Sequence, residues 1–127
     1  MIEVVCGIIY KDNNVLICRR NENKQLGGYW EFPGGKLESN ESAEQALKRE
    51  LTEELQMTVR IKKHYTSVIH NYENFTIKLI AYKCEFIEAG FKLVDHDKYE
   101  WSPIDNIILK KLAPADIPIV EKLIIEK

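Results

Sequence analysis

The spacing of apolar and polar positions changes along the chain, and each change predicts an element. Residues 2–10 are rich in β-branched side chains, and residues 15–20 form a second such run after the polar turn cluster 11–14. This pattern predicts two strands joined as a hairpin. Residues 21–29 are polar and contain a glycine pair, which predicts a mobile loop. Residues 30–36 read as a short extended piece broken by proline and two glycines.

A helix is predicted next, because from residue 43 the apolar residues recur at helical spacing among good helix formers. Ser42 and Gln45 form a capping-box pattern at its start, so the predicted helix covers residues 42–56. Residues 58–70 and 75–86 are rich in strand-forming side chains around a polar turn and predict a second, long hairpin.

The last third of the chain predicts shorter elements. Residues 90–97 are expected to form a loop or weak strand, residues 99–101 a short strand, and residues 116–126 the last helix, with Asp116 as its N-cap. Together the elements predict a single domain over residues 1–127 of the α/β (α+β) class. Its core would be a mixed, mostly antiparallel sheet with two main helices, one on each face.

Composition narrows the class of function. The chain carries 18 Lys and Arg against 20 Asp and Glu, a formal net charge of −2, which argues against a dedicated binder of nucleic-acid polymers. Cys6, Cys18 and Cys84 fit neither a disulfide framework nor a zinc site, so we expect three buried thiols in a cytoplasmic protein. We expect no membrane partner, because no apolar stretch approaches the ~18 residues that span a bilayer, and no signal-peptide pattern begins the sequence.

The candidate chemistry lies on the predicted helix of residues 42–56. Glu50, Glu53 and Glu54 are three or four residues apart, so their carboxylates lie on one helical face. Like charges at this spacing are destabilising unless a hard divalent cation lies between them, and oxygen ligands favour Mg²⁺ or Mn²⁺. Gly34 and Gly35 precede the helix, and a backbone without Cβ atoms can approach a ligand closely.

These residues stand in a pattern that resembles the Nudix box. Six of its seven fixed positions match, and Gln56 stands where the family has its last glycine; the matching residues are Gly35, Glu41, Arg49, Glu50, Glu53 and Glu54. Residues 30–36 and 112–118 resemble the MutT-like branch of small nucleoside triphosphate pyrophosphohydrolases, and the second string looks most like the bacterial CTP pyrophosphohydrolases. The resemblance implies a Nudix-type α/β/α sandwich.

The resemblance also implies a set of metal ligands. Mg²⁺, with Mn²⁺ as a substitute, would be bound by Glu50, Glu53, Glu54 and the backbone carbonyl of Gly34, with Asp95 as a further ligand from a loop. Asp97 is an alternative to Asp95. Glu53, Glu50 and Asp95 each remain candidates for the general base.

The same resemblance implies supporting residues. Glu41 and Arg49 would form a salt bridge that orients the helix, and Gly35 and Glu31 would support the site. Gln56 would either end the helix in a left-handed turn, at a cost of ~1 kcal/mol, or let the helix end differently.

The substrate residues are a further implication. Arg20 and Lys36 would contact phosphates, and Phe32 and Phe75 would hold the base by stacking, with Tyr29 and Trp30 as weaker candidates. Asp116 would accept a hydrogen bond from the base edge, as the exocyclic amine of cytosine could offer, although an N-cap requires the same residue type.

The expected reaction converts (d)NTP and water to (d)NMP and pyrophosphate, as house-cleaning of CTP/dCTP-type or oxidised nucleotides such as 8-oxo-dGTP. The partner is a small-molecule nucleotide, and the protein is expected to be a monomer or homodimer. Two alternatives remain open. One is a Nudix hydrolase of dinucleoside polyphosphates, ADP-ribose or a similar linked diphosphate, and the other is a catalytically silent nucleotide-sensing module.

Overall fold

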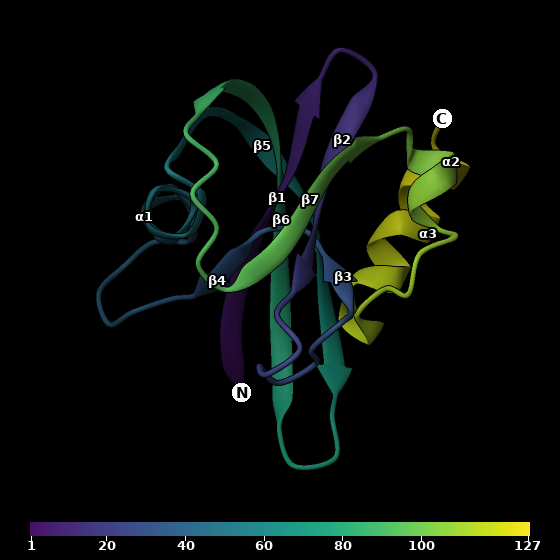
Figure 1. The fold of residues 1–127 in the computed structure, drawn as a ribbon. Helices are drawn as coiled ribbons and strands as arrows, with labels where there is room; N and C mark the ends of the chain where they lie inside the picture. Colours follow the sequence, from purple (N-terminus) through teal and green to yellow (C-terminus); the bar gives the residue numbers. More distant parts are fainter.

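The computed structural model describes residues 1–127 and shows a twisted sheet with α1 on one side and α2 and α3 on the other (Figure 1). The elements in chain order are β1 (Ile2–Lys11), β2 (Asn14–Arg20), β3 (Trp30–Glu31), β4 (Gly34–Lys36), α1 (Ala43–Leu55), β5 (Met57–Asn71), β6 (Thr76–Ala89), β7 (His96–Ser102), α2 (Ile104–Ile107), the 3₁₀ turn η1 (Pro114–Asp116) and α3 (Ile117–Ile125).

The sheet is mixed and mostly antiparallel, as predicted. Its main strand order is β3-β2-β1-β6-β5, while β4 pairs with β1 and β7 pairs with β2. β1 and β6 run parallel, and the other strand pairs are antiparallel. Both predicted hairpins are confirmed, and the β5–β6 hairpin extends beyond the rest of the sheet (Figure 1).

Two cores form because successive residues of β1 point to opposite faces of the sheet. Val5 and Ile9 belong to the buried cluster that includes the apolar side of α1. Cys6 and Ile8 belong to the cluster that includes α2 and α3. The predicted arrangement of a helix on each face is therefore confirmed. β1 lies between the layer of α1 and the layer of α2 and α3.

Helix α1 begins and ends through local contacts of its own sequence. The predicted capping box is present: the Gln45 N–H donates to Ser42 Oγ at 3.1 Å, and the Ser42 N–H donates to Gln45 Oε1 at 2.9 Å. Gln56 has φ 49° and ψ 46°, and its N–H donates to carbonyls of the last turn. The helix thus ends in the left-handed turn without the glycine that the family pattern has there.

The C-terminal third differs most from the prediction. β7 is longer than residues 99–101, and α2 is a four-residue helix that the sequence pattern did not predict. α3 begins at Ile117, after the 3₁₀ turn η1, and not at Asp116.

Cys6, Cys18 and Cys84 are buried free thiols, as predicted, and burial raises the pKa of each. None of the helices has the length and apolar character needed to cross a membrane.

Candidate active site

Helix α1 and strand β4 meet where Glu50 lies against Gly35. An ideal Cβ atom at residue 35 would lie 2.2 Å from the Glu50 Cδ and 2.4 Å from its Oε2, so a side chain there would displace the carboxylate. Gly34 is as close to β1, because its Cβ would lie 1.9 Å from the carbonyl oxygen of Val5. The two glycines therefore let a glutamate of α1 reach the backbone of β4.

The β1–β4 ladder leaves the carbonyl of Gly34 free. The Gly7 N–H donates to the Pro33 carbonyl at 2.9 Å, and the next pair along the ladder is Cys6 with Gly34. Bonded and non-bonded pairs alternate in an antiparallel ladder, so Gly34 directs its carbonyl away from β1. A ligand that lies on the side of β4 away from β1 can therefore bind this oxygen.

Arg49 connects the helix carboxylates with the loop that precedes α1. Its Nε and Nη2 donate to the two oxygens of Glu41 at 2.7 and 3.0 Å. Its Nη1 donates to Glu50 at 2.9 Å and to Glu53 at 3.2 Å, and Nη2 also donates to the Lys36 carbonyl at 3.0 Å. The predicted Glu41–Arg49 salt bridge is confirmed, and these hydrogen bonds lower the pKa of Glu41.

Glu54 is the last of the three α1 glutamates, Glu50, Glu53 and Glu54, which we call the carboxylate set. It lies next to Asp95, in the loop before β7. The Asp95 N–H donates to Glu54 Oε2 at 3.2 Å. Burial, together with the Asp95 carboxyl, raises the pKa of Glu54 to about 7. Burial would also raise the pKa of Asp95, but hydrogen bonds from Glu54 and Lys24 outweigh it and lower that pKa.

The glutamates share one helical face but do not point at one spot. Glu50 and Glu53 turn toward Arg49 and Glu54 turns toward Asp95, so no three His, Cys, Asp or Glu side chains surround a common metal position. Burial raises the pKa of Glu50. The hydrogen bond and positive charge of Arg49 lower that pKa, and the negative charges of Glu53 and Asp95 raise it further. The carboxylate oxygens of these glutamates and the free Gly34 carbonyl are nevertheless the kind of ligand that a hard divalent cation takes, once the side chains turn toward it.

A cavity of about 380 Å³ opens beside Gly34 and Gly35. Its walls are mainly apolar and include two of the predicted base-stacking residues, Phe32 and Phe75. Its polar side chains belong to Arg20, Gln25, Glu31, Lys36, Tyr72 and Asp116. The predicted phosphate, base and support residues thus share this cavity, next to the carboxylate set.

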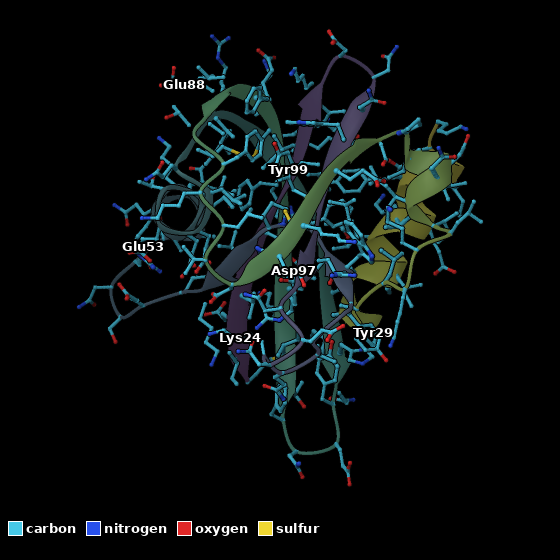
Figure 2. The ribbon with its side chains drawn as sticks, viewed as in Figure 1. Lys24, Tyr29, Glu53, Glu88, Asp97 and Tyr99 are labelled. Carbon is cyan, nitrogen blue, oxygen red and sulfur yellow. The ribbon has the colours of Figure 1, made fainter.

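Two stacking candidates are not on the cavity wall. Trp30 lies under the ammonium of Lys110, 4.1 Å from its ring centroid, and Tyr29 lies under Lys111 at 4.4 Å. Figure 2 shows Tyr29 on the α3 side of the molecule, away from Glu53 on α1. Neither ring lines the cavity, so this structure does not bring Tyr29 or Trp30 together with the other predicted base-binding residues.

Glu31 is the centre of a polar cluster at the cavity floor. Its Oε2 accepts from Arg20 Nη1 at 3.1 Å and lies 2.9 Å from His96 Nε2. His96 is 3% exposed, and its Nδ1 is buried without a hydrogen-bond partner. Sequence reasoning missed His96, because a single histidine at the start of a short strand carries no distinguishing pattern.

Asp97 is not equivalent to Asp95 in this structure. Both of its oxygens accept from Arg19, at 2.8 Å each, on the exposed side of β7 (Figure 2). Of the two candidates, only Asp95 lies next to a glutamate of α1.

Asp116 is buried, and its Oδ2 accepts from the Phe32 N–H at 2.9 Å. Burial raises its pKa well above the usual range, and the nearby charge of Glu31 adds to the rise. Asp116 occupies the predicted N-cap position of α3, but its side chain makes no capping hydrogen bond. Its φ of −84° and ψ of −21° are helical, whereas a capping side chain goes with an extended backbone, and the carboxyl contacts β3 instead.

Tyr72 is a cavity residue that sequence reasoning also missed. It lies in the turn between β5 and β6 and stacks on Phe75, with ring centroids 5.1 Å apart. Its position in a polar turn gave no signal of this contact.

A mixed sheet between helices carries an acidic helix packed on the Gly34–Gly35 strand beside a cavity, an arrangement that fits a small enzyme acting on a small molecule. The family model described as NUDIX domain matches residues 4–122, and the chain belongs to the Nudix family. The predicted resemblance to MutT-like Nudix hydrolases is confirmed. Enzymes of this family use divalent metal ions and act on small-molecule nucleotides.

One curated relative and one solved structure match nearly the whole chain, and a second curated relative matches about three fifths of it. It is 36% identical over 121 residues to the CTP pyrophosphohydrolase of Escherichia coli K12, covering 95% of this chain and 90% of that protein. It is 44% identical over 79 residues to the 8-oxo-dGTP diphosphatase of Proteus vulgaris, covering 61% of this chain and 70% of that one. The solution structure of the MutT protein of methicillin-resistant Staphylococcus aureus 252 has a TM-score of 0.79 and 37% identity, covering 99% and 97% of the two chains.

Proposed function

We propose that this protein is a Mg²⁺-dependent nucleoside triphosphate pyrophosphohydrolase that converts (d)NTP and water to (d)NMP and pyrophosphate. One observation carries the proposal: Glu50, on the acidic helix α1, lies against Gly35, and Gly34 and Gly35 line a cavity of about 380 Å³, a size typical of small-molecule sites. The names of two relatives, a CTP pyrophosphohydrolase and an 8-oxo-dGTP diphosphatase, support house-cleaning of cytosine or oxidised nucleotides.

The residues that would hold Mg²⁺, or Mn²⁺ in its place, are Glu50, Glu53, Glu54, Asp95 and the Gly34 carbonyl. All of them offer oxygen atoms, the ligands that these cations prefer. When bound, the cation neutralises polyphosphate charge and lowers the pKa of a water molecule.

The chain's own residues hold and orient the reacting groups. Arg49 donates to Glu50 and Glu53 at once, so both carboxylates stay on the β4 side of α1. A carboxylate among Glu53, Glu50 and Asp95 takes the proton of the attacking water. Glu53 is the most exposed of them, with 57% of its side chain accessible, so water can reach its carboxylate.

The phosphates would lie at the end of the cavity near Gly34, where Arg20 and Lys36 offer positive charge. Arg20 is held by Glu31 and by the Gln25 carbonyl, which its Nε contacts at 2.9 Å. A guanidinium fixed in this way can present its remaining donors to phosphate oxygens without a further loss of side-chain entropy.

The base would lie in the part of the cavity lined by Phe32 and Phe75, where Phe75, the more exposed of the two rings, can stack on any base. Asp116 has one oxygen engaged by Phe32, and its other oxygen can accept a hydrogen bond from a base edge when the carboxyl is ionised. The exocyclic amine of cytosine is a donor of this kind. We place this activity in the cytoplasm, where reducing conditions keep free thiols such as Cys6 unpaired.

A nucleotide panel tests the proposal. The protein is incubated with Mg²⁺ and dCTP, CTP, 5-methyl-dCTP or 8-oxo-dGTP, and pyrophosphate, phosphate and NMP are measured to give kcat/KM. We expect one pyrophosphate per NMP from at least one triphosphate. Release of AMP from dinucleoside polyphosphates without turnover of triphosphates, or binding without turnover, would contradict the proposal.

A further inference from the structure

The loop of residues 21–29 is fastened to the segment that carries Asp95. The Lys24 Nζ lies 3.2 Å from Asp95 Oδ1. The Asn21 N–H donates to the Asp95 carbonyl at 3.0 Å, and the Asn21 side chain donates to the Val94 carbonyl at 3.1 Å. Three contacts therefore join two loops that are about seventy residues apart in the sequence.

The same loop also forms part of the nucleotide cavity. Gln25 and Leu26 line that cavity, and the Gln25 carbonyl accepts from Arg20 Nε. Lys24, labelled in Figure 2, thus lies one residue before the first cavity residue of this loop and in contact with Asp95. A movement of Lys24 would therefore change both its contact with Asp95 and the position of the cavity residues Gln25 and Leu26.

The charges around Asp95 give Lys24 a specific place. Asp95 faces Glu54 on one side and the Lys24 ammonium on the other, and Lys24 is the only side chain that forms an ion pair with it. A divalent cation bound between the two carboxylates would come within a few ångströms of that ammonium. Two cations at such a distance repel each other, so they compete for the same oxygen atoms.

We propose that Lys24 is a positioning residue that occupies the cation position on Asp95 in the metal-free protein and leaves it when a divalent cation binds. Metal binding then releases the residue 21–29 loop from the Asp95 side chain while the Asn21 bonds remain. Because that loop carries Gln25 and Leu26, the metal site and the nucleotide cavity are coupled. The inference rests on the proposed function only for the identity of the metal site.

Mn²⁺ binding to the nucleotide-free protein tests this directly. Free Mn²⁺ is measured by electron paramagnetic resonance at about 0.15 M salt, where distant surface charges are screened. The proteins are wild type, Lys24→Met, Lys24→Arg and Lys92→Met. Lys92 is exposed, lies in the same loop as Asp95 and forms no ion pair, so Lys92→Met removes an equal charge without the contact. Melting temperatures confirm folding, and Lys24→Gln replaces Lys24→Met if methionine lowers that temperature.

We expect Lys24→Met to bind Mn²⁺ about threefold to tenfold more tightly than wild type, because the competing ammonium is gone. Lys24→Arg and Lys92→Met should both stay near wild type. Unchanged or weaker binding by Lys24→Met would overturn the inference. If wild type binds Mn²⁺ and hydrolyses triphosphates while Lys24→Met matches it in Mn²⁺ affinity, the inference alone fails. If wild type neither binds Mn²⁺ nor hydrolyses nucleotides, the proposed function fails with it.

Discussion

The Glu50 carboxylate fills the space where a side chain on Gly35 would stand, since a Cβ atom there would come within 2.2 Å of the Glu50 Cδ. The contact joins a strand that borders the cavity to a helix that carries the acidic residues. A change at Gly35 therefore acts on the site through Glu50 and not through the core.

Gly35→Ala should lower activity far more than it lowers stability. The methyl group meets the flexible end of Glu50, which can swing away with little strain in the fold, but the carboxylate then leaves its place. We expect kcat/KM to fall by about 100-fold or more, since displacement of a charged group in an active site costs this much. Gly28→Ala is the control, because a Cβ there has open space around it although its φ is +83°. Similar losses in the two variants would contradict this account.

Metal affinity should depend on pH through Glu54. Its pKa of about 7 means that the metal-free protein holds a proton there which the cation must displace. We expect Mn²⁺ affinity to rise roughly tenfold per pH unit below pH 7 and then to level off. Activity at limiting metal should rise with it.

The same pKa fixes the sign of the stability effect. The pKa of Glu54 is higher in the folded than in the unfolded protein, so its contribution is complete at low pH and is lost as pH rises through 7. Glu54→Gln should make both the Mn²⁺ affinity and the stability less dependent on pH. A Mn²⁺ affinity independent of pH in wild type would count against the assignment of Glu54 as a ligand.

Asp116→Asn should stabilise the protein most at alkaline pH. Burial raises the pKa of Asp116, so wild type loses stability as rising pH forces the carboxyl to ionise in the folded protein. Asparagine keeps an oxygen for the Phe32 N–H and carries no charge. We expect its melting temperature to exceed that of wild type at pH 8 by more than at pH 5, together with weaker preference for cytosine. Parallel pH profiles would exclude an ionisable Asp116.

Gln56→Gly should stabilise the fold by about 1 kcal/mol, because glycine adopts the left-handed conformation of residue 56 without steric cost. Urea denaturation measures the change. Gln56→Ala is the matched control and should stay close to wild type, since alanine keeps the same backbone strain. A glycine variant less stable than wild type would show that the Gln56 side chain contributes more than the strain costs.

The sequence predicted what depends on local patterns. Helix α1 followed from its apolar spacing and from Ser42 with Gln45, and the carboxylate face followed from the spacing of its glutamates. The prediction for Asp116 was ambiguous, because an N-cap and a buried acceptor require the same residue type. Only the 3₁₀ turn before α3, which the sequence did not predict, decided between them.

What the sequence could not predict are contacts between distant segments. His96 meets Glu31 from a strand 65 residues away, and Lys24 meets Asp95 across two loops. Neither residue belongs to a repeating or family pattern, so only the fold shows what they contact. The contact of Trp30 with Lys110 is of the same kind, because the two residues are eighty positions apart in the sequence.

The most direct test of the central claim is the steady-state hydrolysis of dCTP with saturating Mg²⁺ by wild type and Glu53→Gln, with pyrophosphate counted. Glu53 is exposed on α1, so glutamine should leave the melting temperature unchanged. We expect kcat to fall by at least about 100-fold, the effect of losing a ligand or base in metal-assisted hydrolysis. A folded Glu53→Gln protein that released pyrophosphate at the wild-type rate would contradict the account.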